Sequence, residues 1–313
     1  MWGPRVPDAR WLWSNRVLEV VGDHVDTELG EIAEELLAMK SQRRYLLLGI
    51  PGETHWARVF AAVDQLLACA VEVLRAAHDG KRCWRLIAEV QIMTRFDHPK
   101  LVRGYDVGGQ DGWPYVVMEL CDPDLETWAA GKPTTDVIAR LVEAGRELEA
   151  MHGERIVHGD IKPENVLLAD GVAKLADFGL AGPRGWSPRV RGTVGYIASE
   201  VGDGYRELSC DVFSFAATAW VTLLGRPPCG PPRTASTSAA AMVQFERVRE
   251  GELELDGIDR RRPTSAIVKA LRPALVPEPL DRPTLAEFLA QFESLTEPKG
   301  LLGRLRARAQ GER

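Results

Sequence analysis

His158–Leu168 reads HGDIKPENVLL and is the most informative segment of the chain. It contains Asp160, a lysine two residues later and an asparagine five residues later, followed by an apolar run. Seventeen residues after Asp160 comes Asp177-Phe178-Gly179, preceded by the strand-like VAKLA. A chance occurrence of both motifs at this spacing is negligible. They therefore indicate a functional site rather than ordinary core packing.

With these motifs the chain resembles the eukaryotic-like (Hanks-type) Ser/Thr protein kinases. Further matches follow in the family's order. They are GTVGYIASE at 192–200, Asp211 at the start of an apolar helix as the acid that braces the catalytic loop, and Arg282 in DRPT as a partner for Glu200. Ser199 stands where the family usually has proline. The resemblance covers about residues 44–295. It implies an α+β, bilobal fold with a small β-rich N-lobe and a larger, mostly helical C-lobe.

The resemblance also implies the roles of four side chains. Phosphoryl transfer depends on positioning and charge stabilisation more than on covalent help from the protein. Asp160 would orient the attacking hydroxyl and accept its proton, and Lys162 would neutralise the phosphoryl group in transfer. Asn165 and Asp177 would hold Mg²⁺, a hard cation that prefers oxygen ligands.

An ATP pocket is implied upstream and around these motifs. The backbone of Glu119 and Cys121 would bind adenine, Met118 would lie at the back of the pocket, and Asp124 would contact the ribose. The full set implied for ATP binding is Gly52, Val59, Ala70, Glu72, Glu89, Met118, Glu119, Cys121, Asp124 and Leu167. The implied cofactors are ATP and Mg²⁺.

The sequence departs from the family at the strand lysine, whose position is taken by Glu72. A lysine there attracts the phosphates and the helix glutamate, which is matched by Glu89; a glutamate repels both. One unit-charge pair at about 4 Å contributes roughly 4 kcal/mol at an effective dielectric constant of 20. We therefore expect a weakened grip on the nucleotide, unless Glu72 is protonated or helps to hold a metal. A replacement cation could come from Arg58, Lys81 or Arg82.

Two glycine-related departures accompany this one. The family's glycine-rich loop reads GETHWARV here, so only the first glycine, Gly52, is kept. Side chains at the other positions hinder close approach of the backbone to phosphate. Gly159 stands where the family commonly has an arginine that gathers a phosphate on the activation segment. Regulation by phosphorylation of that segment would lack its usual receptor.

Three hypotheses follow. The first is an active Ser/Thr protein kinase with an atypical phosphate grip. The second is a catalytically impaired pseudokinase that acts as a scaffold or allosteric binding module, because of Glu72 and the altered loop. The third is a small-molecule kinase of the aminoglycoside-phosphotransferase type. The KPEN string, the DFG motif and the GTVGYIASE segment argue against the third.

The pattern along the chain predicts four parts: an N-terminal extension at 1–43, an N-lobe with its hinge at 44–121, a C-lobe at 122–295 and a basic, solvated tail at 296–313. Apolar runs predict strands within 44–74 and at 114–121. Helical periodicity predicts helices at 27–40, 84–96, 136–152 and 210–225. Pro, Ser and Thr predict a loop at 227–240.

Composition is that of an ordinary soluble protein, with 313 residues, 45% hydrophobic, and a net charge of −6 that does not favour nucleic acid. Five cysteines without a CxxC pair favour a reducing, cytoplasmic location. We see no signal peptide, and the apolar run Phe215–Leu224 is too short to span a bilayer. The expected partner is a protein substrate or binding partner.

Overall fold

A computed structural model describes residues 45–53, 57–64, 67–74, 92–93, 101–110, 113–187, 190–229, 237–253 and 264–296. The chain divides into two compact units, one formed by residues 1–94 with 103–121 and the other by residues 95–102 with 122–313. Several predictions concern residues outside the described ranges: the extension at 1–43, most of the helix at 84–96, Glu89, and the tail from 297 onward.

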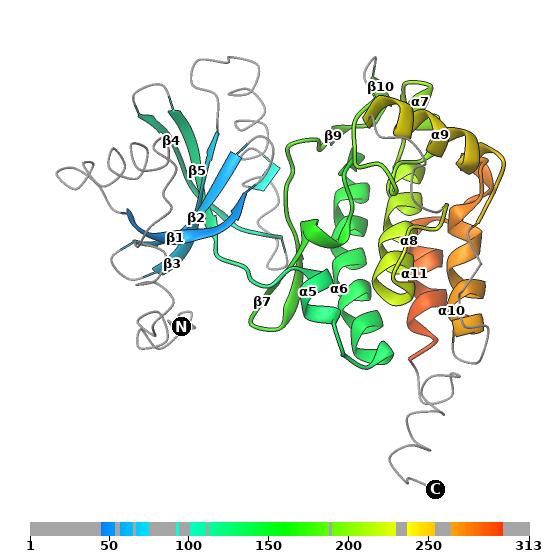
Figure 1. Cartoon of the computed structure of the whole chain (residues 1–313), viewed down its shortest axis with the longest axis horizontal. Coiled ribbons are helices and arrows are strands. Elements are labelled where there is room, and N and C mark those ends of the chain that lie inside the picture. Colours follow the sequence, from blue (N-terminus) through cyan, green and yellow to red (C-terminus); the bar gives the residue numbers. More distant parts are fainter. Residues whose placement is uncertain are drawn as a thin grey trace, which may run out of the picture. The chain divides into compact units, whose positions relative to one another are not determined.

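The first unit contains a five-stranded antiparallel sheet in the order β1-β2-β3-β5-β4 (Figure 1). Its strands are β1 (Tyr45–Glu53), β2 (Ala57–Asp64), β3 (Leu67–Leu74), β4 (Gly104–Gln110) and β5 (Trp113–Glu119). The strands predicted within 44–74 and at 114–121 are confirmed. Strand β4 was not predicted because its sequence, GYDVGGQ, contains three glycines, which are depleted in strands. Pairing with β5 forms it nonetheless.

The second unit is mostly helical. Its helices are α5 (Leu125–Ala129), α6 (Thr134–Gly153), α7 (Ser199–Gly202), α8 (Leu208–Leu224), α9 (Thr237–Arg249), α10 (Thr264–Leu271) and α11 (Leu285–Glu293). Short 3₁₀ turns are η2 (Pro163–Asn165), η3 (Arg272–Leu275) and η4 (Pro279–Asp281). Three two-stranded sheets pair β6 (Ile156–Val157) with β9 (Gly182–Pro183), β7 (Val166–Ala169) with β8 (Val172–Leu175), and β10 (Gly185–Trp186) with β11 (Tyr205–Arg206).

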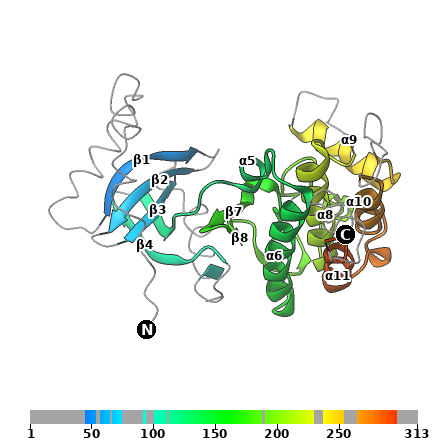
Figure 2. The same cartoon turned by 90° about the horizontal axis from the view of Figure 1, so that it is seen from below.

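The core of this unit lies where α6, α8 and α11 pack together (Figure 2). The ring of Phe215 meets Phe288 edge-on at 6.1 Å between centroids, and Phe288 stacks on Phe292 at 5.6 Å. Gly145 in α6 lies so close to α11 that a Cβ atom there would be 2.4 Å from a methyl group of Leu289. Close packing of the helices therefore requires glycine at this position.

Helix α8 is the apolar helix that the sequence predicted, and its residues from Cys210 to Trp220 are all buried. It ends at Gly225, whose left-handed φ of 80° is the usual helix-terminating conformation of glycine. Within the part of the chain that the structure describes, no helix has the length and apolarity to cross a membrane. The buried face of α8 instead supports the loops that carry the chemically informative motifs.

The predicted loop at 227–240 is wrong at its C-terminal end. Helix α9 begins at Thr237, so four residues assigned to the loop are helical. The run Ala239–Ala241 explains the difference, because alanine has the highest helix propensity of all residues. Serine and threonine before it are typical of a helix start as well as of a loop.

Candidate active site

Three polar side chains meet at Asp160: Asp160 and Lys162 come from the loop between β6 and β7, and Thr193 comes from a later segment. The Oγ1 hydroxyl of Thr193 donates a hydrogen bond to Asp160 Oδ1 at 2.7 Å. Lys162 Nζ lies 3.3 Å from Asp160 Oδ2 and donates to Thr193 Oγ1 at 3.1 Å. The three groups thus form a closed triangle.

Asn165, at the end of η2, is turned back onto the same aspartate. Its Nδ2 donates to the backbone carbonyl of Asp160 at 2.8 Å and lies 3.4 Å from Asp160 Oδ2. The side chain of Asn165 is buried, so this amide is fixed in orientation. Because Nδ2 donates to the loop, the amide oxygen is the atom of this side chain that can act as an acceptor.

Asp211 in α8 holds the loop from beneath. Its buried carboxylate accepts hydrogen bonds from the backbone N–H of His158 at 2.7 Å and of Gly159 at 2.9 Å, and lies 3.0 Å from His152 Nε2. Burial by itself would raise the pKa of Asp211, but the hydrogen bond and charge of His152, together with the hydrogen bond from the Gly159 N–H, lower it below its ordinary value. The brace predicted for Asp211 is confirmed.

His158 connects this loop to the Asp177-Phe178-Gly179 segment. Its Nε2 lies 3.2 Å from the carbonyl of Ala176, its ring contacts Phe178 at 5.3 Å between centroids, and its Nδ1 faces the N–H of Asp160 at 3.4 Å. Burial lowers the pKa of His158, which favours the neutral ring. Nδ1 is then the acceptor and Nε2–H the donor. A buried, neutral histidine therefore fixes the spacing of the two motifs.

Asp177 is exposed and adopts a left-handed backbone conformation with φ of 59°. Its Oδ1 accepts a hydrogen bond from the N–H of Gly179 at 3.3 Å. The N–H of the preceding Ala176 donates to the carbonyl of Asn165 at 2.9 Å, which places the two predicted metal ligands on directly bonded segments. Such a conformation is uncommon for a residue other than glycine and is often found at functional sites.

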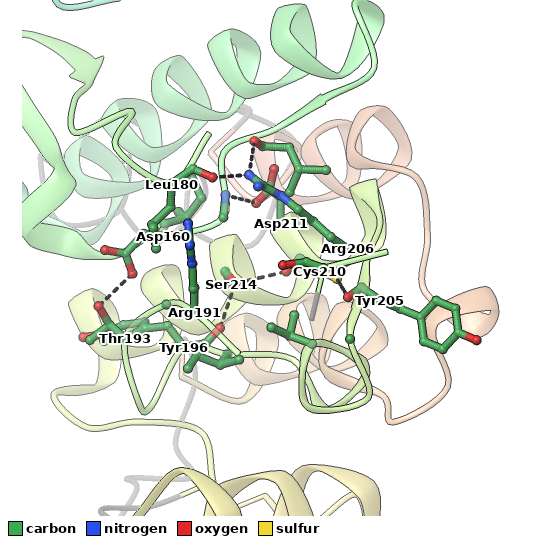
Figure 3. A pocket seen from close by; sticks show the side chains of 18 residues that line it. Asp160, Leu180, Arg191, Thr193, Tyr196, Tyr205, Arg206, Cys210, Asp211 and Ser214 are labelled. Carbon is green, nitrogen blue, oxygen red and sulfur yellow. Dashed lines mark hydrogen bonds between the residues drawn. The ribbon is translucent and has the colours of Figure 1, made fainter. Parts of the chain in front are cut away.

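A small cavity lies next to this loop (Figure 3). Its volume is about 60 Å³, and Asp160, Thr193, Arg206 and Asp211 are among the residues that line it. In Figure 3, Thr193 points toward Asp160 on one side of the cavity, and Arg206 reaches Leu180 on another.

The predicted pairing of Glu200 with Arg282 is confirmed as a buried ion pair. Arg282 Nη2 lies 3.0 Å from Glu200 Oε2, and Nη1 contacts the other carboxylate oxygen. The side chain of Arg282 is completely buried. Cys210 donates its S–H to Glu200 at 3.3 Å, and burial raises the pKa of this thiol. This cluster fastens the segment after Thr193 to the helical core.

Comparison with known proteins agrees with this geometry. The family model described as "Protein kinase domain" matches residues 49–292, a range that includes both motifs and most of both units. The chain belongs to the protein kinase family.

Relatives of this kinase include bacterial and plant proteins. It is 29% identical over 211 residues to the serine/threonine-protein kinase PrkC of Bacillus subtilis, covering 62% of this chain and 32% of PrkC. It is 33% identical over 177 residues to the serine/threonine-protein kinase PknL of Mycobacterium bovis, covering 53% and 44%. A putative L-type lectin-domain containing receptor kinase V.2 of Arabidopsis thaliana is 30% identical over 197 residues, covering 58% and 30%. The chain spans less than half the length of each of these relatives.

The nucleotide-binding residues predicted for the first unit lie on adjacent strands of the sheet. Backbone register pairs Gly52 with Val59, Val59 with Glu72, and Glu72 with Val116, so these residues form one row across β1, β2, β3 and β5. Ala70 pairs with Met118 two residues further along the same strands. The sequence positions chosen for the phosphate and adenine contacts are therefore neighbours in the sheet.

The residues predicted for the hinge lie at the end of β5 and directly after it. Met118 is buried and Glu119 is half-buried. The N–H of Glu119 donates to the carbonyl of Arg103 at 2.8 Å, and its side chain accepts from the N–H of Arg103 at 3.3 Å. Cys121 is half-buried.

Asp124 and Leu167 belong to the second unit, where they form an isolated β-bridge. Asp124 Oδ1 accepts from the N–H of Thr127 at 2.7 Å and caps α5. The predicted ribose contact is therefore also a helix cap.

Sequence reasoning missed two residues of the site. His152 contacts Asp211 from the last turn of α6, and Arg206 in β11 contacts the loop from a strand 46 positions after Asp160. Neither residue belongs to a short motif. Only the fold reveals them, because both act through contacts between elements distant in sequence.

Proposed function

We propose that this chain binds ATP with Mg²⁺ and transfers the γ-phosphoryl group to a serine or threonine hydroxyl of a protein substrate. The closed triangle of Asp160, Lys162 and Thr193 is the observation that carries the proposal. It holds the carboxylate of Asp160 beside the ammonium group of Lys162, the two groups to which the resemblance assigns the transfer chemistry. Asp160 orients the substrate hydroxyl and takes its proton as the new O–P bond forms and the bond to ADP breaks.

The polar groups around the loop fit a magnesium ion. The amide oxygen of Asn165 and the exposed carboxylate of Asp177 are hard oxygen donors on adjoining segments. In the described part of the chain, no group of three or more His, Cys, Asp or Glu side chains could hold a metal by itself. A site with one carboxylate and one amide suits Mg²⁺, which usually takes its remaining ligands from phosphates and water. The ion supplies charge neutralisation for the phosphates.

Lys162 provides a positive charge beside Asp160. Its ammonium group stays close to the carboxylate and to Thr193, so it is held in place before substrate arrives. A cation fixed in advance stabilises the charge on the transferring group without reorganisation cost.

Adenine binding is assigned to the backbone of Glu119 and Cys121, with Val59 and Ala70 as apolar contacts. Among the described residues, Cys210 and Cys229 form no disulfide bond, and a reducing, cytoplasmic location is part of the proposal.

A second candidate is a pseudokinase that binds partners without efficient transfer. It rests on Glu72, which lies in the middle of β3, paired on one side with Val59 and on the other with Val116. A glutamate in this row brings a negative charge to the strand on which the family carries its phosphate-binding lysine. A measurement of phosphate transfer distinguishes the active kinase from the pseudokinase. A measurement of ATP binding tests the nucleotide site that both candidates would have.

ATP with Mg²⁺ is expected to raise the melting temperature of the wild type, and Asp177→Asn is expected to abolish the magnesium-dependent part of this shift. Ligand at a hundred times its Kd stabilises a protein by about 2.7 kcal/mol. Asparagine suits the left-handed backbone at position 177, so the variant should fold. Thermal unfolding with ATP and either Mg²⁺ or EDTA measures the effect. An equal shift in both solutions for the wild type would contradict the assignment of Asp177.

A further inference from the structure

Gly159 leaves space that a guanidinium group from another element fills. Its backbone is left-handed, with φ of 83°, and a Cβ atom there would lie 3.1 Å from Arg206 Nη2 and 3.2 Å from the carbonyl oxygen of Leu180. The loop that carries Asp160 therefore has no cationic side chain of its own at this position. Arg206 reaches it from β11, which pairs with β10.

Arg206 bonds to two segments at once. Its Nη2 donates to the carbonyl of Val157 at 2.9 Å and to the carbonyl of Leu180 (Figure 3). Val157 is the last residue of β6, directly before the loop with Asp160, and Leu180 directly follows the segment that begins with Asp177. A single guanidinium thus connects the start of one motif segment to the end of the other.

The surroundings of Arg206 show that this contact is built into the fold. The same two segments pair as β6 and β9, and Gly182 in β9 would place a Cβ atom 3.7 Å from Arg206 Nη1. Asp211, whose carboxylate accepts hydrogen bonds from the loop, has a negative charge that raises the pKa of Arg206 and so offsets part of the effect of burial. The positive charge of Arg191 lowers the pKa of Arg206. Burial lowers the pKa of Arg206, although arginine stays charged at neutral pH.

We propose that Arg206 is a positioning residue that holds the Asp177 segment in register with the Asp160 loop. The inference rests on the proposed function, because the register matters for catalysis only if both aspartates serve one reaction. Arg206 acts on the carbonyls of Val157 and Leu180 and not on substrate. From β11, its guanidinium group occupies the space beside Gly159.

The test compares Arg206→Ala with Arg184→Ala in the full chain. Arg184 lies between β9 and β10 and is half exposed, with its Nη1 3.6 Å from Glu207 Oε2. With labelled ATP, Mg²⁺ and a protein acceptor, kcat of Arg206→Ala is expected to fall on the order of tenfold or more, since a displacement of about 1 Å can cost a hundredfold. KM for the acceptor should stay unchanged, and Arg184→Ala should match the wild type.

Two further measurements separate positioning from mere stability. Millimolar guanidinium chloride should restore part of the kcat of Arg206→Ala and leave that of Arg184→Ala unchanged. Amide hydrogen exchange in peptides covering Phe178–Gly182 should be faster in Arg206→Ala. A folded Arg206→Ala protein with wild-type kcat, or equal effects of guanidinium on both variants, would overturn the proposal.

Failure of the proposed function leaves a different signature. If the wild type transfers no phosphate, the exchange measurement still reports on Arg206. Faster exchange confined to Phe178–Gly182 then supports the positioning role, and unchanged exchange overturns it.

Discussion

Asp160→Asn is expected to reduce phosphate transfer by at least about a hundredfold, the lower end of what general-base catalysis contributes. Asparagine keeps the shape of the side chain and can still accept the hydrogen bond that Thr193 makes to Oδ1. It cannot accept the proton of a substrate hydroxyl, and it no longer balances the charge of Lys162. The loss should therefore appear in kcat, with the melting temperature close to that of the wild type. Initial rates with labelled ATP at saturating concentration measure it.

Asp170→Asn is the matched control for this prediction. Asp170 lies in the exposed turn between β7 and β8 and has a left-handed φ of 51°, which asparagine also tolerates. The same chemical change is thus made in the same unit, away from Thr193 and Lys162. Equal rates for Asp160→Asn and Asp170→Asn would show that the carboxylate of Asp160 takes no part in transfer.

Arg282→Leu is expected to lower the free energy of unfolding by about 3–5 kcal/mol, the usual cost of removing one partner of a buried ion pair. All donor directions of this guanidinium are used: its contacts are Val276 O at 2.9 Å, Ser209 O at 3.1 Å, Pro277 O at 3.0 Å and both carboxylate oxygens of Glu200. The substitution leaves a buried carboxylate with only the S–H of Cys210 near it. Urea unfolding measures the change as a shift of the midpoint at constant slope.

Arg249→Ala provides the comparison for an exposed pair. Arg249 and Asp203 also form an ion pair in this unit, but their side chains are 49% and 53% exposed. Pairs of this kind contribute about 0–1 kcal/mol. If Arg282→Leu lowers the free energy of unfolding no more than Arg249→Ala does, the buried ion pair does not stabilise the fold. Combining Glu200→Leu with Arg282→Leu should recover part of the stability, since no unpaired charge then remains.

Local sequence patterns predicted the strands and helices whose apolar residues follow a regular strand or helix pattern. The apolar runs of β1, β2, β3 and β5 and the buried face of α8 are examples. Strand β4 and the first turn of α9 were not predicted correctly. The glycines of β4 are unfavourable in strands, so its sequence does not predict the strand that forms by pairing with β5. Thr237 and Ser238 are common both in loops and at the start of a helix.

The site could be predicted as far as its motifs extend. Asp160, Lys162 and Asn165 lie within six residues of one another, so their proximity follows from the chain itself. The roles of Asp211 and Arg282 followed from resemblance. Arg206 could not be found in either way, because its function depends on contacts with Val157 and Leu180, which are 49 and 26 residues away.

The central claim is that the group of side chains around Asp160 transfers phosphate to a protein hydroxyl. The most direct measurement is the chemical identity of the labelled residue after the wild type is incubated with γ-labelled ATP, Mg²⁺ and an acceptor protein. We predict phosphoserine or phosphothreonine in the acceptor, well above the level produced by Asp160→Asn. A folded wild type that binds ATP with Mg²⁺ but leaves no label on serine or threonine would contradict the account.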